Sequence, residues 1–368
     1  MFGGSPCQDF SIAGKKNGSS WTCKDCGYEY NPIMVHYSRR NNCPQCGSSL
    51  IEKTRSSLLV EWLRILKEKM PRFAIYENVK GITSNKFKPT FDSFISELNE
   101  YGYNVYWAQI NAMDQGIPQS RERVYCVIIR QDIDTGTFKF PNPRPLERTL
   151  YDMLDYGVDK RYYLNEDASI ELINSMREGT NVSYCITQNY WKGINFKGYV
   201  ERRRNQLVAD TGIRKLTPVE AWRLFGFDDE DFNAARSALI QNVYEGRDRA
   251  NTQLYKMAGN SIVVDVILHI LENLYKEMPI LFEDIQVGSF FSGIGAFEKA
   301  LTKLDPNNLS DDTDNGDCNK DISLNQLGFI CGYNGDANRI YDATVARTLK
   351  AEAGGGGAKT GWYYIGEE

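Results

Sequence analysis

No stretch of the sequence is apolar over enough residues to cross a membrane. The best candidate, residues 261–274, is interrupted by Asp265, His269 and Glu272 and is typical of an amphipathic helix. The opening sequence, MFGGSPCQDF, lacks both the positively charged start and the apolar core of a signal peptide. These absences predict a cytoplasmic protein without a membrane segment.

The chain also lacks the excess of positive charge that many nucleic-acid-binding proteins carry. Its 43 Lys and Arg residues are outnumbered by 48 Asp and Glu residues, so the formal net charge is −5. This balance does not exclude DNA as a partner, because contact with phosphates needs only a local basic surface. Each local basic cluster is equally compatible with a solvated face. The clusters are Lys15 with Lys16, Arg39 with Arg40, Arg121 with Arg123, and Arg202 with Arg203 and Arg204.

The chain has nine cysteines and no secretion signal, so disulfides are not expected. Cys126 lies in an apolar run and is predicted to be a core residue. Cys185, Cys318 and Cys331 carry no clear signal. The remaining five cysteines lie in two settings that suggest chemistry.

Four of them form two CxxC pairs in a segment that we call the ribbon, residues 21–53. Each pair lies in a tight turn, KDCG or PQCG, and sixteen residues separate the pairs. Four thiolates suit a tetrahedral, structural Zn²⁺ ion and leave no open position for catalysis; the alternative is four free thiols. His36, between the pairs, is expected at the surface. A further hypothesis is that Arg39 and Arg40 let the ribbon contact DNA. The predicted ligands are Cys23, Cys26, Cys43 and Cys46.

Helical and strand patterns alternate along the first part of the chain, which favours an α/β layered fold. The 368 residues suffice for one large domain or two smaller ones. After Arg130 the regularity fades, and residues 131–210 are predicted to form a small second domain or a set of loops. The expected helices are residues 56–69 and 90–100, and the expected strands are residues 73–79, 105–110 and 123–129.

Periodicity returns at Leu216, where Thr217 and Pro218 predict the cap and first position of a helix. Asn260 and Ser261 form a possible N-cap pair before a long helix near residues 261–277. Residues 285–291 then predict a strand that enters a glycine turn. The last sixty or so residues are rich in Asp and Asn and then carry a glycine run, residues 354–357, that is flexible by composition.

Cys7 and Glu77 are the first candidates for catalysis. Cys7 follows Pro6 in the glycine-rich loop GGSPCQDFS, where a thiolate can act as a nucleophile. Glu77 follows a predicted buried strand in YENV, where a carboxyl group can exchange protons with a bound heterocycle. Taken alone, Cys7 is more simply interpreted as a structural cysteine, and Glu77 as a surface glutamate at the end of a strand.

A second group of candidates suits ligand contact. Gln119, Arg121 and Arg123 alternate in QSRERVYCVIIR and would share one face of a strand. The two guanidiniums could hold a phosphate, a carboxylate or a carbonyl, although an exposed edge with charge pairs is the alternative. Gly293 and Gly295, after Phe291, would let the backbone approach a ligand at a helix start.

In combination, GGSPCQDFS, YENV, QSRERVY, GNSIVV and SFFSGIGAFEKAL resemble the motifs of the DNA (cytosine-5)-methyltransferases, and RKLTPVEAWRLFGF resembles the motif before that family's last helix. The resemblance touches most of residues 1–20, 56–130, 213–277 and 285–304. It implies an α/β fold with a Rossmann-like, S-adenosylmethionine-dependent methyltransferase sheet and a small target-recognition domain. The zinc ribbon would be an insert in the methyltransferase domain.

The resemblance also implies a mechanism on double-stranded DNA, in an enzyme of restriction-modification or phage type. Cys7 would add to C6 of a cytosine, Glu77 would protonate N3, and Arg123 with Arg121 would orient the base. C5 would take a methyl group from S-adenosylmethionine after the base leaves the stack. The implied cofactor-pocket residues are Phe291, Gly293, Gly295, Asn260, Ser261 and Pro6.

The same resemblance divides the chain into parts. Residues 1–130 would form the catalytic part, with the ribbon as an insert. Residues 131–212 would form the target-recognition region, in which Arg202 to Arg204 suit phosphate contact. Residues 213–304 would complete the methyltransferase domain with the cofactor motifs. Residues 305–368 form a tail that resembles a target-recognition segment.

Two departures from the family leave other interpretations open. The glycine motif follows the GNSIVV segment, so the motif order is circularly permuted, which a compact fold can accommodate. Counterparts of two strands with acidic, cofactor-binding residues are not evident; Asp321 and Asp336 are weak substitutes. The alternatives are therefore a catalytically incomplete remnant that binds DNA, an enzyme completed by a second polypeptide, or an RNA methyltransferase.

Overall fold

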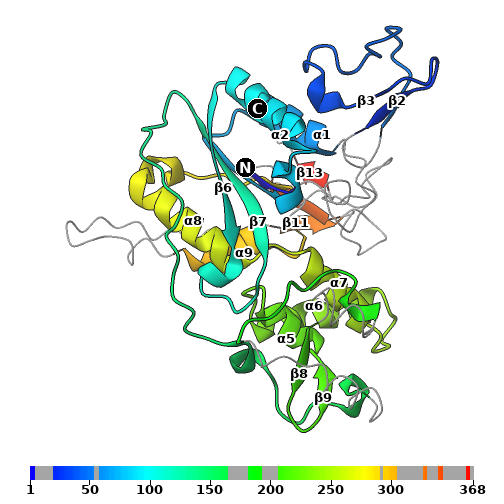
Figure 1. The fold of residues 1–368 in the computed structure, drawn as a ribbon, viewed down its shortest axis with the longest axis vertical. Helices are drawn as coiled ribbons and strands as arrows, with labels where there is room; N and C mark the ends of the chain where they lie inside the picture. Colours follow the sequence, from blue (N-terminus) through cyan, green and yellow to red (C-terminus); the bar gives the residue numbers. More distant parts are fainter. Residues whose placement is uncertain are drawn as a thin grey trace.

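The centre of the fold is a five-stranded mixed sheet with helices on both faces (Figure 1). The computed structural model describes residues 1–4, 20–53, 58–164, 181–192, 206–290 and 293–304, and the backbone of three short strands in the tail. The strand order is β10-β1-β5-β7-β6. In sequence order, these strands are β1 (Phe2–Gly3), β5 (Phe73–Val79), β6 (Tyr103–Asn111), β7 (Glu122–Arg130) and β10 (Ser289–Phe290).

Strand directions divide the sheet into two parts. β10, β1 and β5 run parallel, whereas β7 is antiparallel to both β5 and β6. The predicted strand at residues 73–79 is confirmed at both ends, and those at 105–110 and 123–129 are confirmed with a slight extension. The strand expected over residues 285–291 forms only at Ser289–Phe290, where the two-residue β1 offers it a partner.

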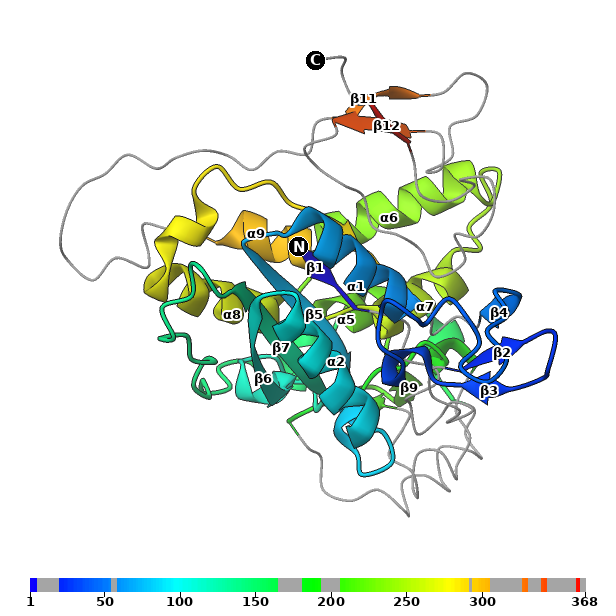
Figure 2. The ribbon, with the colours of Figure 1, turned by 90° about the horizontal axis from the view of Figure 1, so that it is seen from above.

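Alternate side chains of the central strands enter two separate cores. Ala74 and Tyr76 of β5 pack with α1 (Leu58–Lys69) and α2 (Lys88–Glu100) on one face. Phe73 and Ile75 pack on the other face against the second helical layer (Figure 2). That layer includes α8 (Val264–Glu277) and α9 (Ala296–Lys303). The period of two in a strand thus accounts for the layered architecture, and Cys126 is fully buried as predicted.

The segment Asn251–Glu277 meets the length and hydropathy of a membrane span, which the sequence analysis did not expect. It consists of α7 (Asn251–Asn260) and α8, and 72% of its most apolar window is buried inside the protein. The core helix of a soluble protein passes the same test, so this segment is weak evidence for a membrane.

The assignment of Asn260 and Ser261 as an N-cap pair is wrong. Asn260 is the last residue of α7, and Ser261 is its C-cap, whose backbone N–H donates to the Ala258 carbonyl at 2.8 Å. The N-cap of α8 is Val263, which makes no side-chain capping bond. By contrast, Thr217 caps α5 (Pro218–Arg223) in a capping box with Glu220, as the sequence predicted.

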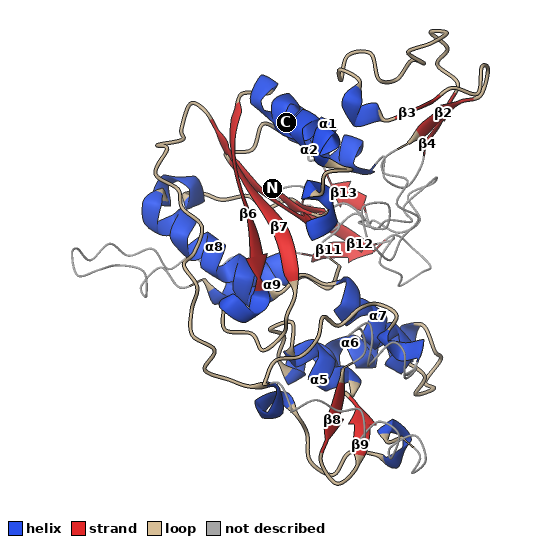
Figure 3. Cartoon of the chain, in the orientation of Figure 1, coloured by secondary structure: helices blue, strands red, loops and turns tan. Residues whose placement is uncertain are grey.

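Helices dominate the region that follows the sheet in sequence (Figure 3). α5, α6 (Asp229–Asn242) and α7 accompany the hairpin of β8 (Leu207–Ala209) and β9 (Ile213–Lys215). Arg214 and Glu220 form a salt bridge with both side chains 0% exposed, which ties the hairpin to α5. Single 3-10 turns occur at Lys80–Thr83, Ala112–Asp114, Leu150–Met153, Lys160–Tyr162, Tyr190–Lys192 and Pro279–Phe282.

Two smaller sheets complete the described structure. The ribbon contains β2 (Trp21–Cys23), β3 (Glu29–Tyr30) and β4 (Ile51–Lys53) in the antiparallel order β3-β2-β4, and a 3-10 turn at Pro32–Met34. Figure 1 places it at the opposite end of the long axis from β8 and β9. The tail contains β11 (Gln326–Phe329), β12 (Arg339–Asp342) and β13 (Trp362–Tyr364), which form a separate sheet.

Gly259 provides a test of the packing around α7. A Cβ at this position would lie 2.2 Å from both Thr187 C and Gln188 N. Because these are backbone atoms, Gly259→Ala should destabilise the protein by about 1–3 kcal/mol, despite the better helix propensity of alanine. Urea denaturation measures this change. The control is Gly212→Ala, whose Cβ would meet only the Tyr163 ring, at 3.2 Å. Equal denaturation midpoints for both variants would refute this packing.

Candidate active site

Glu77 and Arg123 form an ion pair at one end of the sheet. Their strands are antiparallel, and the register places Glu77 opposite Tyr125, two residues beyond Arg123. This diagonal arrangement lets long side chains on one face meet. The Arg123 Nε lies 3.1 Å from the Glu77 Oε1, and the two side chains are only 16% and 13% exposed. The structure therefore brings together two of the predicted catalytic residues.

The Glu77 carboxylate lies against the chain that leads to the predicted nucleophile. A Cβ added to Gly4 would lie 3.1 Å from Glu77 Oε2 and 3.0 Å from the Glu77 carbonyl oxygen. The glycine thus permits a close approach that a side chain would prevent. Cys7 and Pro6 lie outside the described residues. Gly4 nevertheless shows that the GGSPC segment begins beside Glu77.

Burial raises the pKa of Glu77, and the positive charges of Arg123 and Arg121 only partly oppose this effect. Desolvation penalises the ionised carboxylate more than the neutral acid. A carboxyl group in this state can hold a proton at a higher pH than an exposed glutamate. It is therefore suited to give a proton to a bound base.

Arg121 is buried, and backbone carbonyls surround its guanidinium. Its Nη2 donates to the carbonyl oxygens of Ser261 at 2.8 Å and Gly259 at 3.4 Å, and its Nη1 donates to that of Ile186 at 3.1 Å. The guanidinium carbon also lies 4.8 Å from the centre of the Phe225 ring. These contacts suit a residue that holds the backbone around the site in position.

Gln119 binds the same stretch of backbone as Arg121, at Ile186. Its Nε2 donates to the Leu224 carbonyl at 2.7 Å, and its Oε1 accepts from the Ile186 N–H at 3.1 Å. Both Gln119 and Arg121 are buried, and β7 lies inside the sheet between β5 and β6. The alternative of an exposed strand edge is therefore wrong.

Cys185 is a site residue that the sequence did not indicate. Its Sγ accepts a hydrogen bond from Arg121 Nη1 at 3.3 Å. Burial alone would raise the pKa of this thiol, but the charges and hydrogen bonds of Arg121 and Arg123 lower it overall. No spacing rule links Cys185 to Arg121, because their contact depends on how residues 181–192 pack against the residues before β7.

Two parts of the predicted cofactor pocket also meet. Gly293 and Gly295 have φ values of +68° and +88°, in the left-handed region that favours glycine. A Cβ on Gly293 would lie 4.0 Å from the Asn260 carbonyl oxygen. Asn260 is exposed, whereas Ser261 is buried and its Oγ donates to the Ile262 carbonyl. Phe291 lies outside the described residues.

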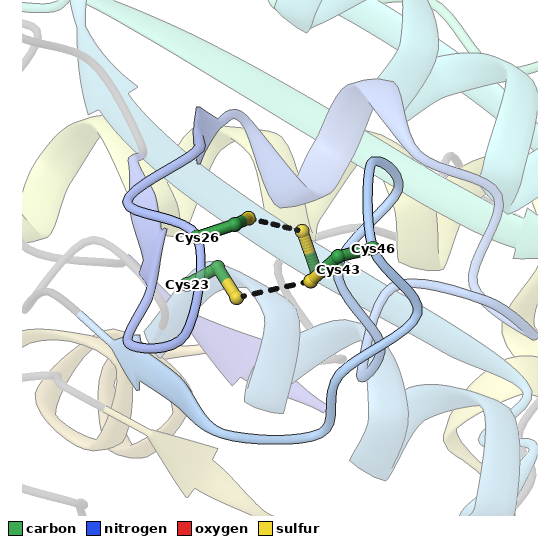
Figure 4. Close-up of side chains that lie close together, drawn as sticks. All are labelled: Cys23, Cys26, Cys43 and Cys46. Atoms are coloured by element: carbon green, nitrogen blue, oxygen red, sulfur yellow. Dashed lines mark hydrogen bonds between the residues drawn. The ribbon is translucent and has the colours of Figure 1, made fainter.

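The four ribbon cysteines converge on one point (Figure 4). Their sulfur atoms all lie within 4.8 Å of one another, and the Cys23–Cys46 and Cys26–Cys43 pairs are each 3.6 Å apart. A tetrahedron with Zn–S bonds of about 2.3 Å has sulfur–sulfur edges of roughly 3.8 Å. The donor set and its spacing thus fit Zn²⁺. His36 is a surface residue, as expected, and its Nε2 lies 3.2 Å from a Glu100 oxygen.

The hypothesis that Arg40 contacts DNA is wrong. Arg40 is only 3% exposed, and its guanidinium pairs with Glu97 of α2. Arg39 is exposed. The Arg202–Arg204 cluster and the acidic candidates Asp321 and Asp336 lie outside the described residues.

Comparisons with known proteins identify the family of the chain. The sequence profile of the family described as C-5 cytosine-specific DNA methylase matches residues 45–276. Type II methyltransferase M2.ScrFI of Lactococcus lactis subsp. cremoris is 36% identical over 281 residues, which cover 74% of this chain and 64% of that protein. The chain therefore spans less than two thirds of the length of this relative.

Two further relatives are similar over more of their own length. Type II methyltransferase M.Bsp6I of Bacillus sp. (strain RFL6) is 30% identical, over 76% of this chain and 79% of that protein. Orphan methyltransferase M.SPBetaI of Bacillus phage SPbeta is 26% identical, over 75% of this chain and 81% of that protein. These matches define the class as DNA methyltransferases. The chain belongs to the C-5 cytosine-specific DNA methylase family.

The raised pKa of Glu77 gives a prediction with a defined sign. The folded protein binds this proton more tightly than the unfolded chain. The resulting stabilisation is present below the unfolded pKa of about 4.3 and is lost as the pH rises through the folded value. Glu77→Gln removes this pH dependence but also takes the carboxylate partner from the largely buried Arg123, so the variant should be less stable than the wild type, by up to about 3 kcal/mol at low pH, with a deficit that shrinks as the pH rises.

Urea denaturation at pH 4.5 and 7.5 checks this, because the deficit of Glu77→Gln should be smaller at the higher pH. Glu122→Gln is the control, since Glu122 is 42% exposed and pairs with Lys80 at the surface. A Glu77→Gln variant that loses stability as the pH rises, relative to the wild type, would contradict the assignment.

Cys185 should react as an activated thiol. In a Cys7→Ser background, alkylation of Cys185 by iodoacetamide should have a pH midpoint below the usual thiol value of about 8.5. Arg121→Met should move that midpoint upward, because it removes a charge that favours the thiolate. Peptide mass spectrometry follows each site, with the fully buried Cys126 as the unreactive control. A midpoint at or above about 8.5 would count against the Arg–thiol contact.

Proposed function

We propose that the protein transfers a methyl group from S-adenosylmethionine to C5 of cytosine in double-stranded DNA, through a covalent adduct with Cys7. The observation that carries the proposal is the buried Glu77–Arg123 pair beside Gly4. It supports the proposal because a carboxyl group and a guanidinium lie beside the segment that leads to the predicted nucleophile. The family assignment supplies the reaction class.

The proposed steps use groups of this chain in sequence. The Cys7 thiolate forms a bond to C6 of the flipped cytosine while Glu77 gives its proton to N3. Electron density then moves to C5, which takes the methyl group that S-adenosylmethionine supplies when bound. Loss of the C5 proton to a water molecule, cleavage of the Cys7–C6 bond and return of the N3 proton to Glu77 restore the thiolate, the acid and the aromatic ring. Arg123 orients the base, and Arg121 holds the surrounding backbone.

The cofactor would bind where the glycine turn meets the end of α7. Gly293 and Gly295 leave open backbone there, and Asn260 is exposed beside them. The parallel pairing of β10 with β1 supports a circularly permuted motif order, because it sets the glycine turn next to the catalytic segment. We assign Phe291, Gly293, Gly295, Asn260, Ser261 and Pro6 to this pocket.

The relatives support a role of restriction-modification or phage type. M2.ScrFI and M.Bsp6I are named type II methyltransferases, and M.SPBetaI is named an orphan methyltransferase of a phage. By this analogy the protein acts in the cytoplasm on DNA, and residues 131–212 select its target. We also propose that the ribbon holds a structural Zn²⁺ ion through Cys23, Cys26, Cys43 and Cys46.

The second candidate is a DNA-binding remnant without activity. Among the strands that the structure describes, none pairs with the outer edge of β10, where two further strands with acidic residues were sought. The described Glu77–Arg123 geometry favours the enzyme over the remnant. The relatives lend no support to a completing polypeptide.

Trapping with a modified base tests the enzyme. DNA containing 5-fluorocytosine at target sites cannot lose a C5 proton after methyl transfer, so the wild type should form a covalent complex that survives denaturing electrophoresis. Cys7→Ser should form none, because its hydroxyl is a far weaker nucleophile. Calorimetric binding of S-adenosylmethionine to the variant is the control for an intact fold. A stable adduct with Cys7→Ser would overturn the assignment of the nucleophile.

A further inference from the structure

The ribbon is packed onto the layer formed by α1 and α2, which covers β5 and which we call the catalytic layer. The segment between the cysteine pairs lies along α2, where the Asn31 Nδ2 donates to the Thr90 Oγ1 at 2.8 Å. Tyr30 and Ile33 belong to the same buried cluster as the residues of α1 and α2 that cover β5. The inserted segment thus shares a hydrophobic core with the sheet that carries Glu77.

A buried ion pair lies at the centre of this contact. The side chains of Arg40 and Glu97 are 4% and 6% exposed, and the Tyr101 hydroxyl also donates to the Glu97 carboxylate. The same guanidinium donates to the Val35 carbonyl at 3.3 Å. Removing one partner from a buried pair leaves a desolvated charge without compensation, which is strongly destabilising.

Aromatic and cationic contacts extend the joint to α1. The Lys67 Nζ lies 3.5 Å from the centre of the Tyr37 ring, and Tyr37 packs edge-on against Tyr101 with ring centres 5.2 Å apart. Two helices of the catalytic layer therefore hold the same short segment of the ribbon. Such contacts depend on that segment keeping one conformation.

The four thiolates close the loop that carries these docking residues. Cys26 and Cys43 bracket it, and Arg40 lies three residues before Cys43. The Tyr30 hydroxyl donates to the Arg40 carbonyl at 2.8 Å, so both ends of the loop are tied together close to the sulfur cluster. A metal ion that joins the two pairs fixes the loop ends, and the ion pair fixes the loop on α2.

We infer that the Arg40–Glu97 pair couples the metal centre to the catalytic layer, so that each stabilises the other. The inference rests on the proposed Zn²⁺ site. Because binding and folding are linked, a contact that favours the docked loop also favours retention of the ion. Arg40 is thus a positioning residue for the metal centre, and α2 is its docking surface.

Zinc content and zinc release test the coupling. Metal analysis of the purified protein should give about one Zn²⁺ per chain, as four thiolate ligands require. Transfer of that zinc to a chromogenic chelator should be about tenfold or more faster from Glu97→Gln than from the wild type. The matched control is Glu100→Gln on the same helix, because the Glu100 side chain is 47% exposed and pairs only with His36 at the surface. Its release rate should stay within about twofold of the wild type.

Thermal unfolding gives a second readout. Chelation of the zinc should lower the Tm of the wild type and of Glu100→Gln, and should lower that of Glu97→Gln much less. If Glu97→Gln does not fold, Arg40→Lys replaces it, since a single ammonium cannot reproduce the planar contacts of the guanidinium. Its zinc release should also be faster than that of the wild type.

The outcomes separate the two proposals. A folded wild-type protein without zinc would overturn the metal centre and the coupling with it. Bound zinc that leaves the wild type and the Glu97 or Arg40 variants at equal rates would overturn the coupling alone. A wild-type Tm that does not change on chelation would also overturn the coupling.

Discussion

Backbone hydrogen bonds of the two-residue strand β1 join the segments that carry the site. The Phe2 N–H donates to the Gly288 carbonyl at 2.8 Å on one side, and the Met1 carbonyl accepts from the Ile75 N–H at 2.9 Å on the other. The Phe2 ring also stacks on Phe297 of α9, with ring centres 5.0 Å apart. Through this short strand, the glycine turn after β10 is held beside the strand that carries Glu77.

The parallel arrangement explains why the functional side chains meet although they are far apart in sequence. β10, β1 and β5 run in the same direction, so the segments that follow them leave the sheet at the same end. Open α/β sheets place their ligands at this carboxyl end of the strands. Because β7 is antiparallel to β5, Arg123 near the start of β7 lies at this same end of the sheet. The site therefore depends on strand order and direction, whereas the order of the motifs along the chain is secondary.

Local patterns were sufficient to predict β5 and the helix cap at Thr217, because a buried strand and a helix start depend on neighbouring residues. The family motifs marked both Glu77 and Arg123, and the structure brings them together in an ion pair that the motifs did not predict. The N-cap assignment of Asn260 and Ser261 was wrong. The pair suits a helix start in sequence, but α7, which precedes it, ends there and takes Ser261 as its C-cap.

Residues whose role depends on tertiary contacts could not be found from the sequence. Arg40 resembled a DNA contact because it follows Arg39 in an apparently exposed loop, yet it is buried against Glu97, fifty-seven residues away. Cys185 lies in a region of weak periodicity, and its neighbours Arg121 and Arg123 come from another part of the chain. In both cases the decisive contact is between a charged group and a partner that only the fold brings near.

These buried charges have a common physical logic. Each guanidinium at the sheet edge has a different kind of partner: a carboxylate for Arg123, and backbone carbonyls with a thiol for Arg121. The Nη atoms of Arg121 donate to backbone carbonyls and a thiol, and its charge acts on both Glu77 and Cys185. The Glu77 carboxyl keeps a raised pKa despite two nearby cations, since desolvation outweighs their attraction. The same two guanidiniums thereby act on both groups, and the pKa of the acid is raised while that of the thiol is lowered.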